Sequence, residues 1–509
     1  MTRTSWLVIV FCCVGMTAAG AANTVKARAN ANPDRYNPLI FGSFLEHFDN
    51  QVYGGVYDPK SKFADEDGFR RDVIEALKKI RVPIVRWPGG CFVSAYHWKD
   101  GVGPNREPAY NKAWFVEEPN TFGTDEYVKW CRKVGCEPYI CTNAGTGGPE
   151  EMSDWVEYCN QTLGKFARMR EKNGHKEPYG VRYWSVGNEN WGRHEIGAKT
   201  TDEWGPFVRE STKMMRAADI RTKILAAATT NEKWTLPLLQ NAGYLLDYVS
   251  IHHYALAHIY RPHDYMDSVL RTDDADRNID AVRRIIDKAK LGGRVKIAYD
   301  EWNLRGWHHP WLGDFRRGMD FAARRENDTA STYTMADAVY AACQLNAFLR
   351  NCDIVDIACF APVVNTTGLV FVHENGVLRR TTYHVYDLYV NHLLPFRLPI
   401  DLTGEVLCAN RRETRVFDAV VTCDEQRTKY ALALVNKSPD KVTPVAVDFA
   451  SLGKGTPTTV RARVLRGDAP DAFNSIENPE RVHIEEQVLE VRDGMIDVPA
   501  HAVLVLRVE

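Results

Sequence analysis

The sequence predicts an α/β protein that combines a (β/α)8 TIM barrel with a C-terminal all-β sandwich. Between residues 40 and 390, eight apolar runs typical of buried parallel strands alternate with helix-like segments. Beyond residue 391 these give way to short alternating runs separated by Gly, Asp and Pro. The chain has 509 residues, which is long enough for both domains.

The N-terminal segment 1–22 predicts a cleaved signal peptide. Arg3 precedes an apolar run over residues 6–14, and small residues follow through position 22. We therefore expect a secreted or periplasmic protein. The next segment, 23–39, contains an alternating run at 24–29 that predicts a strand joining the sandwich.

The barrel is expected to occupy residues 40–390. Its predicted strands are 40–46, 83–87, 138–142, 183–186, 223–228, 248–252, 295–299 and 354–360. Helical periodicity predicts helices at 69–80, 125–133, 203–217, 281–289 and 333–349. The sandwich is expected over 391–509, with clear strand patterns at 428–435 and 498–507.

Composition excludes several functions. The net charge of −2 creates no field that favours nucleic acid or an anionic membrane. After the leader no apolar stretch approaches the roughly 18 residues that a membrane span needs. The glycine-rich segment 143–148 lacks the Lys-Ser/Thr of a phosphate loop, so no cofactor is expected.

Neither the cysteines nor the histidines predict a metal site. Ten of the 12 cysteines follow the leader and none forms a C-x-x-C pair, so most are expected to be small buried residues. One or two disulfides stay open as an alternative. His308 and His309 have no spaced third ligand, and a loop near the site is the better interpretation.

Two glutamates are the strongest candidates for chemistry. Glu189 and Glu301 each follow a predicted strand, about three strand–helix units apart in a barrel that spends about 35 to 45 residues on each unit. Both acids are thus expected at one end of the barrel, where they can flank a glycosidic bond. A retaining glycosidase needs such a pair at roughly 5 to 5.5 Å, one acid as proton donor and the other as nucleophile. The structural alternative is that each glutamate simply pairs with a lysine or arginine.

Several segments carry a family resemblance. They are 183–189 (YWSVGNE), 86–91 (RWPGGC), 299–303 (YDEWN), 44–47 (FLEH), 96–104 (YHWKDGVGP), 120–126 (NTFGTDE) and 250–254 (SIHHY). In order and spacing the series resembles the α-L-arabinofuranosidases of glycoside hydrolase family 51. The Gly-Asn-Glu triplet alone indicates only the wider clan of barrel hydrolases.

The resemblance implies a role for each matching residue. It makes Glu189 the general acid/base, with a pKa raised by the neighbouring negative charge, and Glu301 the nucleophile. It places around the furanose the residues Glu46, Arg86, Cys91, Trp114, Asn188, His252 and Tyr254. Glu46 is expected to accept two sugar hydroxyls, Arg86 to keep Glu301 ionised, and Tyr254 to donate to Glu301.

The sequence departs from the family pattern at two places. Many members carry Asn where this chain has Cys91, and a Gln often stands where it has Cys359. A sulfur contact can replace the first side-chain hydrogen bond. The second departure leaves open which contacts the eighth strand makes with the sugar.

The resemblance implies a retaining, exo-acting enzyme that releases arabinofuranose from arabinan, arabinoxylan or their oligosaccharides. Relatives in this family are often homo-oligomeric. A β-xylosidase or an endo-glucanase is the rival activity, because the same acid pair serves both. From a different class, a catalytically silent carbohydrate-binding protein would keep the fold but lack turnover.

Overall fold

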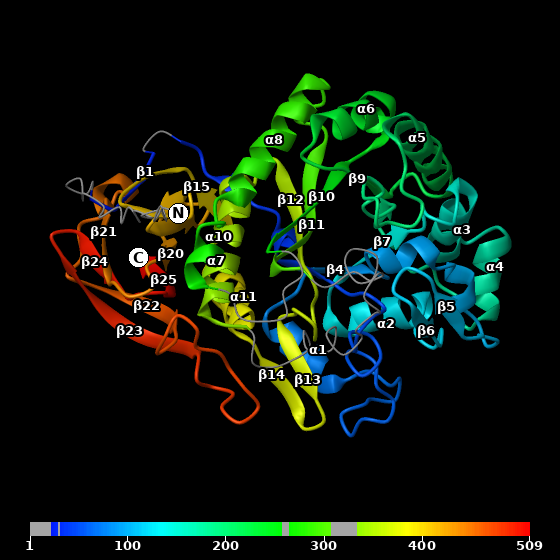
Figure 1. The fold of residues 1–509 in the computed structure, drawn as a ribbon, viewed down its shortest axis with the longest axis horizontal. Helices are drawn as coiled ribbons and strands as arrows, with labels where there is room; N and C mark the ends of the chain where they lie inside the picture. Colours follow the sequence, from blue (N-terminus) through cyan, green and yellow to red (C-terminus); the bar gives the residue numbers. More distant parts are fainter. Residues whose placement is uncertain (1–21, 29–30, 257–263, 307–332, 509) are drawn as a thin grey trace, which may run out of the picture.

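The computed structural model describes residues 22–28, 31–256, 264–306 and 333–508, and Figure 1 shows a barrel beside a β-sandwich. Of the predicted leader only Ala22 belongs to the described residues. His308 and His309 also lie outside them.

Eight parallel strands close into a barrel in the order β10-β11-β12-β3-β4-β7-β8-β9. All eight predicted strands are confirmed. Their bounds are β3 Gly42–Phe44, β4 Ile84–Trp87, β7 Glu137–Thr142, β8 Tyr183–Val186, β9 Lys223–Ala227, β10 Tyr248–Leu256, β11 Lys296–Arg305 and β12 Val355–Phe360. Strands β10 and β11 run several residues past their predicted ends, because their polar residues stay paired with one another beyond the apolar part.

Helices surround the barrel (Figure 1). Their bounds are α1 Arg71–Lys79, α2 Thr124–Val134, α3 Pro149–Asn160, α4 Lys165–Lys172, α5 Thr201–Ala218, α6 Glu232–Ala242, α7 Tyr265–Val269, α8 Asp274–Lys288, α10 Met335–Arg350 and α11 Thr381–His392. The 3-10 helices are η1 Pro38–Phe41, η2 Cys91–Ala95, η3 Trp98–Gly101, η4 Gly243–Leu245 and η6 Phe449–Leu452. Within the described ranges, no helix combines the length and the apolar character needed to cross a membrane.

The five predicted helices correspond to α1, α2, α5, α8 and α10 and are confirmed. In α8, Ile279, Val282 and Ile286 recur at helical spacing and are fully buried against the barrel. By contrast, α11 is buried along its first nine residues, since it lies between the barrel and the sandwich. Its buried residues include Thr, His and Asp, which interrupt the apolar periodicity that predicts a helix.

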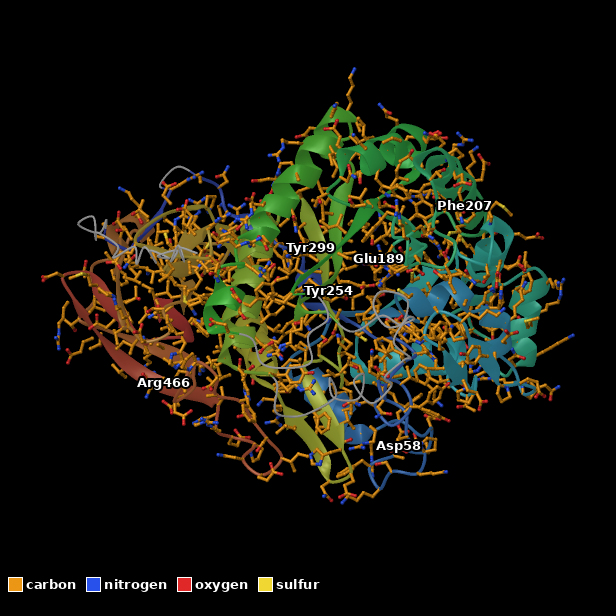
Figure 2. The ribbon with its side chains drawn as sticks, in the orientation of Figure 1. Asp58, Glu189, Phe207, Tyr254, Tyr299 and Arg466 are labelled. Atoms are coloured by element: carbon orange, nitrogen blue, oxygen red, sulfur yellow. The ribbon has the colours of Figure 1, made fainter. Side chains whose placement is uncertain are left out.

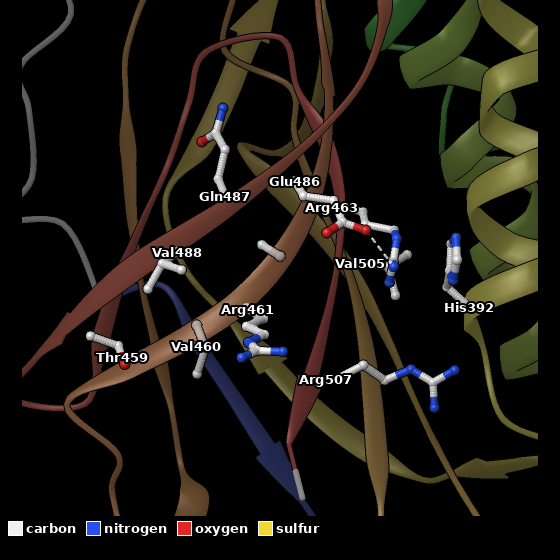
Figure 3. Close-up of a pocket in the computed structure, with 11 residues that line it drawn as sticks. His392, Thr459, Val460, Arg461, Arg463, Glu486, Gln487, Val488, Val505 and Arg507 are labelled. Carbon is white, nitrogen blue, oxygen red and sulfur yellow. Dashed lines mark hydrogen bonds and ion pairs between the residues drawn. The ribbon is translucent and has the colours of Figure 1, made fainter.

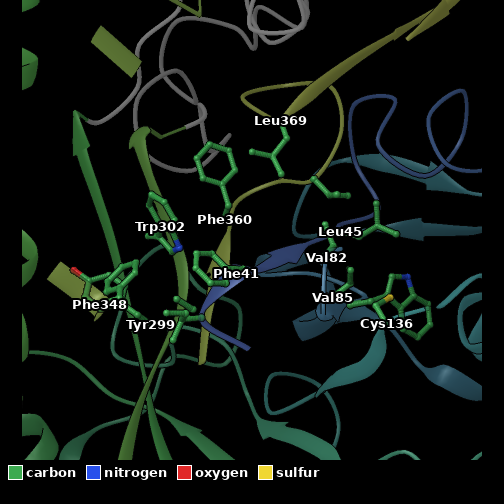
Figure 4. Close-up of a cluster of buried hydrophobic side chains, with 14 of the residues drawn as sticks. Phe41, Leu45, Val82, Val85, Cys136, Tyr299, Trp302, Phe348, Phe360 and Leu369 are labelled. Carbon is green, nitrogen blue, oxygen red and sulfur yellow. The ribbon is translucent and has the colours of Figure 1, made fainter. Parts of the chain in front are cut away.

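The main core fills the layer between the barrel strands and the helices. Figure 4 shows part of it, where Trp302 packs between Phe348 and Phe360 at ring-centroid distances of 5.3 and 5.0 Å. Inside the barrel, a smaller buried cluster that includes Phe44 and Tyr139 forms an apolar floor. The polar groups described below stand above this floor.

In the described part of the chain, eleven strands form one continuous sheet that folds into the sandwich, in the order β16-β1-β21-β24-β23-β22-β25-β20-β19-β15-β2. Their bounds are β1 Thr24–Ala27, β2 Asp34–Arg35, β15 Phe396–Leu398, β16 Ile400–Thr403, β19 Phe417–Cys423, β20 Tyr430–Asn436, β21 Thr443–Val447, β22 Thr459–Arg466, β23 His483–Arg492, β24 Met495–Val498 and β25 Val503–Val508. Strand β1 pairs with β16 and β21, so the N-terminal segment contributes a strand to the sandwich.

The sandwich packs firmly on the barrel. Helices α10 and α11 contact β19, β20 and β25, and the outward-facing Ala431, Ala433 and Val505 belong to the same buried cluster as the barrel core. Three two-stranded hairpins complete the fold: β5 Ala109–Asn111 with β6 Val116–Glu118, β13 Val370–His373 with β14 Gly376–Arg379, and β17 Val406–Ala409 with β18 Arg412–Arg415.

Candidate active site

Glu189 and Glu301 belong to the fourth and seventh strands of the barrel in chain order. Glu189 follows β8 directly, after a turn in which Gly187 has φ 68°. Glu189 itself has φ 41°, in the left-handed region that non-glycine residues seldom adopt. Such strained positions occur often at functional sites, where the surrounding structure holds them.

The structure brings the two glutamates together across one imidazole. Nδ1 of His252 lies 2.8 Å from Oε1 of Glu189 and 3.4 Å from Oε2 of Glu301. A carboxylate oxygen of each glutamate and the imidazole nitrogen all lie within 4.8 Å of one another. In Figure 2, Glu189 and Tyr254 are seen near the middle of the barrel.

Glu301 is held from two sides. Nη1 of Arg86 donates to Oε1 at 2.5 Å, and the Tyr254 hydroxyl donates to Oε2 at 2.7 Å. Arg86 is fully buried on β4, and the Glu301 side chain is only 4% exposed. An ion pair of this kind keeps a buried carboxylate charged, as a nucleophile requires.

Asp300 points into the barrel beside Glu301. The register of β11 against β12 shifts between Tyr299 and Trp302, and such a bulge re-aims neighbouring side chains. Asp300 accepts hydrogen bonds from Tyr139 and Ser250 hydroxyls, each at 2.6 Å. Burial alone would raise the pKa of Asp300, but Arg86, His252 and the hydrogen bond from Ser250 outweigh burial and lower it. Asp300 is therefore a fixed negative charge beneath the site.

His252 and His253 diverge as strand alternation predicts. His252 faces the two glutamates, whereas Nε2 of His253 lies 3.6 Å from Asp274 of α8, outside the barrel. Burial alone would lower the pKa of His252. Glu301 and the other carboxylates around the ring outweigh burial and raise that pKa to about 10.

Glu46 and Trp114 form one wall. Oε1 of Glu46 accepts from the Phe92 amide at 2.8 Å and from Nε1 of Trp114 at 2.7 Å, so one oxygen already has two protein donors. Oε2 is buried and has no hydrogen-bond partner among the described residues. Oε2 is therefore the oxygen that is open to sugar hydroxyls, and the expectation that Glu46 accepts two of them stays a prediction. Burial, then the nearby Glu301, raises the pKa of Glu46 from 4.5 to about 8.

Asn188 and Cys91 form the opposite wall. Oδ1 of Asn188 accepts from Arg86 at 2.8 Å, and its Nδ2 donates to Glu195 at 3.0 Å and lies 3.9 Å from the Cys91 sulfur. Cys91 is buried, and burial together with Glu195 raises the pKa of its thiol well above 9. The thiol therefore contributes a neutral sulfur surface at this place.

Comparison with known proteins identifies the family. Residues 76–277 match the alpha-L-arabinofuranosidase 1 domain, and residues 300–502 match the alpha-L-arabinofuranosidase C-terminal domain. A probable alpha-L-arabinofuranosidase C of Aspergillus clavatus is 32% identical over 515 residues, covering 95% of this chain and 97% of that protein. The chain belongs to the α-L-arabinofuranosidase family.

Two further relatives refine the assignment. The crystal structure of the GH51 α-L-arabinofuranosidase of Thermotoga petrophila superposes with a TM-score of 0.82 at 32% identity, covering 96% of this chain and 100% of that one. The intracellular exo-α-(1→5)-L-arabinofuranosidase 1 of Bacillus subtilis is 32% identical over 420 residues, covering 79% of this chain and 82% of that protein. The predicted resemblance to family 51 is thus confirmed.

The expectation that a neighbouring negative charge raises the pKa of Glu189 is wrong. Burial alone would raise the pKa of Glu189, but hydrogen bonds from His194 and His252 outweigh it and lower the pKa. Nε2 of His194 lies 2.7 Å from Oε2 of Glu189, opposite His252 on Oε1. The carboxylate is therefore ionised between two imidazoles before a sugar binds.

Three contributors to the site are absent from the residues predicted from the sequence. His194 and Glu195 lie only five and six residues after Glu189, and this clustering of titratable residues was the available signal. Gly90 lies in the segment 86–91, of which only Arg86 and Cys91 were predicted as site residues. A Cβ at position 90 would lie 3.0 Å from Glu301 Oε1 and 3.2 Å from Glu46 Oε2, so only glycine leaves this space open.

Three clusters among the described residues have the composition of a metal site. One is Glu189, His252 and Glu301, described above, and the other two are also held together by contacts within the protein. Cys91, Glu189, His194 and Glu195 bring ligand-type atoms within 4.8 Å, and Glu189 in this cluster is hydrogen-bonded to two histidines. The third cluster, residues 65–67, is acidic and pairs with Lys133 at 2.6 to 3.1 Å.

A large cavity of about 1000 Å³ lies on the sandwich and not at the barrel mouth (Figure 3). It is lined by β22, β23 and β25, and Arg463 pairs there with Glu486 at 2.5 Å. Glu486 is the one carboxylate among the described residues that line this cavity. A reaction that needs two acids cannot take place there, so its size does not make it the active site.

The cysteines of the described ranges carry no disulfide. All ten are free thiols, nine of them buried and Cys408 exposed. The prediction of small buried residues is confirmed for the nine, and the disulfide alternative does not hold for these ten.

Proposed function

We propose that this chain is a retaining, exo-acting α-L-arabinofuranosidase that removes terminal arabinofuranose from arabinan, arabinoxylan or their oligosaccharides. The observation that carries the proposal is the approach of Glu189 and Glu301 to within 4.8 Å of each other around His252. Inverting enzymes separate their acids by about 6.5 to 9.5 Å to admit water, whereas retaining enzymes hold them at about 5 to 5.5 Å.

Each residue then has a chemical task. Glu301, kept ionised by Arg86, attacks the anomeric carbon while Glu189 protonates the departing oxygen, which breaks the glycosidic bond. In the second step Glu189 removes a proton from water, and the water oxygen displaces Glu301. Two displacements restore the original configuration at the anomeric carbon.

The enclosure of the site supports exo action. Arg86, Asn188, Glu46 and Trp114 are at most 1% exposed, so the residues that would hold the sugar lie deep in the barrel, where a terminal sugar is bound more readily than the middle of a chain. Oε2 of Glu46 is a buried polar atom without a hydrogen-bond partner among the described residues, and it would meet a sugar hydroxyl. The relative from Bacillus subtilis is itself named an exo-acting enzyme for the α-(1→5) linkage.

A panel of aryl glycosides tests this function. We expect hydrolysis of aryl α-L-arabinofuranoside, with weak activity on the xylopyranoside and none on cello-oligosaccharides. A preference for the xylopyranoside or for internal glucan bonds would instead make the chain a β-xylosidase or an endo-glucanase. Arabinose binding with no turnover of any glycoside would make it a carbohydrate-binding protein.

Variants of the two acids test the individual roles. Glu301→Ala should lower kcat by several orders of magnitude. Glu189→Ala should regain turnover of an activated aryl substrate when azide is added, because azide needs no base, and the product should be the α-configured azide. Full activity of either variant without azide would refute the assignment.

We also propose that the protein is exported. The support is the basic, apolar and small-residue pattern of residues 1–22. N-terminal sequencing of the mature protein should start near residue 22 or 23, and an intact Met1 would contradict export by this route.

A further inference from the structure

The acid/base glutamate has an imidazole on each oxygen, and the mechanism above uses neither as a proton source. His252 comes from β10 and contacts Oε1 at 2.8 Å. His194 comes from the loop after β8 and contacts Oε2 at 2.7 Å. The His194 side chain is 14% exposed and that of His252 only 5%, so His194 lies on the solvent side of Glu189.

The loop is built to hold His194 in this place. The Gly192 amide donates to the Glu189 carbonyl at 2.6 Å, and the Glu195 amide donates to the Gly192 carbonyl at 3.0 Å. A Cβ at position 192 would lie 2.4 Å from the His194 ring, so a larger residue there would push the ring out of its place. The next side chain, Glu195, is fixed by Asn188 at 3.0 Å. The imidazole is therefore positioned before substrate arrives.

We propose that His194 is a positioning residue that stores the proton which Glu189 delivers to the leaving group. The inference rests on the proposed function, since it assigns the source of the proton for the same reaction. Its basis is geometric. His194 makes a short hydrogen bond to the acid/base oxygen, backbone hydrogen bonds hold its loop, and its side chain has access to solvent.

The charges around His194 favour its protonated form. Among the described residues, the groups that face it are Glu189, Glu195, Glu301 and the Cys91 thiol. Burial alone would lower the pKa of His194, but Glu189 and the other carboxylates outweigh burial and raise it. The raised pKa of His194 and the lowered pKa of Glu189 both favour the arrangement in which the proton resides on the imidazole and Glu189 is ionised.

The proton balances over the cycle. As the substrate binds, the proton passes from Nε2 of His194 to Oε2 of Glu189, and His194 becomes neutral. That proton passes to the leaving oxygen as its bond to the anomeric carbon breaks and the bond from Glu301 forms. In the second step Glu189 takes a proton from water and returns it to His194, so the enzyme regains its starting state.

His194→Gln tests the proposal, because the amide keeps a hydrogen-bond donor but stores no proton. We compare wild type and variant on an arabino-oligosaccharide, whose leaving group needs an acid, and on 2,4-dinitrophenyl α-L-arabinofuranoside, whose leaving group does not. We expect kcat to fall roughly tenfold or more for the first substrate, since general acid catalysis contributes about 10² to 10⁴. For the second substrate we expect less than a threefold change.

The pH profile gives a second readout. In the wild type the stored proton is lost only when His194 titrates at its raised pKa. In the variant the proton has to reside on Glu189, whose pKa His252 still lowers, so the alkaline limb of kcat/KM on the oligosaccharide should move to lower pH. Arg193→Gln, an exposed position on the same loop, is the matched control and should leave both readouts unchanged.

Equal losses on both substrates with an unchanged pH profile would overturn the proposal and reduce His194 to a structural residue. If His194→Gln does not fold, His194→Ala is assayed with added imidazole. Rescue on the oligosaccharide supports a stored proton, and its absence contradicts it. Failure of the wild type on every arabinofuranoside would instead refute the proposed function, so the two failures are distinguishable.

Discussion

Glu46→Gln should remove a pH dependence from the stability of this protein. Glu46 is fully buried, and burial, then Glu301, raises its pKa from 4.5 to about 8. In the unfolded chain the carboxyl loses its proton near its ordinary pKa, whereas the folded protein keeps that proton up to about pH 8. Within this window the folded state binds more protons, so the free energy of unfolding falls as pH rises.

The size of the effect follows from that interval. One unit of pKa is worth about 1.4 kcal/mol, so the interval from 4.5 to about 8 sets an upper value of about 5 kcal/mol. Water penetration and relaxation reduce this, and we expect about 2 kcal/mol or more. Glutamine is neutral at every pH and has the same shape, so the variant does not lose unfolding free energy at high pH through this side chain.

Urea unfolding followed by tryptophan fluorescence measures the difference. At pH 5 we expect the free energy of unfolding of the variant to be similar to that of wild type or lower. From pH 5 to 8.5 the difference, variant minus wild type, should become steadily more positive. Groups elsewhere in the chain titrate equally in both proteins and cancel in the comparison. A difference in unfolding free energy that stays constant between pH 5 and 8.5 would refute the argument that Glu46 is protonated in the folded site.

Three further predictions concern neighbouring residues. Arg86→Met should destabilise the protein by about 3 to 5 kcal/mol in urea unfolding, because it leaves Glu301 and Asp300 buried without their cation; an unchanged midpoint would contradict this. Gly90→Ala should lower kcat/KM at least tenfold with little change in Tm, since its methyl group enters the space between Glu46 and Glu301; full activity would show that the space is not used. Cys408→Ser should abolish fast reaction of the native protein with a thiol reagent, since Cys408 is the exposed thiol among the described cysteines; a persisting fast phase would contradict this.

The barrel was predictable because its signals are local. Each strand is a short apolar run, and buried parallel strands are read from such runs directly. The amphipathic α8 was equally readable from its stripe, whereas α11 was not, because Thr, His and Asp interrupt its apolar pattern although they are buried.

The same apolar runs predicted where Glu189 and Glu301 lie, but they did not predict the electrostatic environment of either residue. The lowered pKa of Glu189 depends on His194 and His252, which reach it from different parts of the fold. The single free oxygen of Glu46 depends on an amide and an indole that arrive from a separate loop. Interactions between groups far apart in sequence set these properties, so residue pattern alone does not predict them.

The central claim is that Glu301 becomes covalently bound to the sugar, while Glu189 acts as general acid in the first step and as general base in the second. Mass spectrometry of the Glu189→Ala variant, mixed with 2,4-dinitrophenyl α-L-arabinofuranoside and digested, tests it most directly. We predict a pentosyl adduct on the peptide that contains Glu301, because the first step needs no acid with this leaving group and the second step lacks its base. An adduct on another carboxylate, or turnover that gives the inverted sugar with no adduct, would contradict the account.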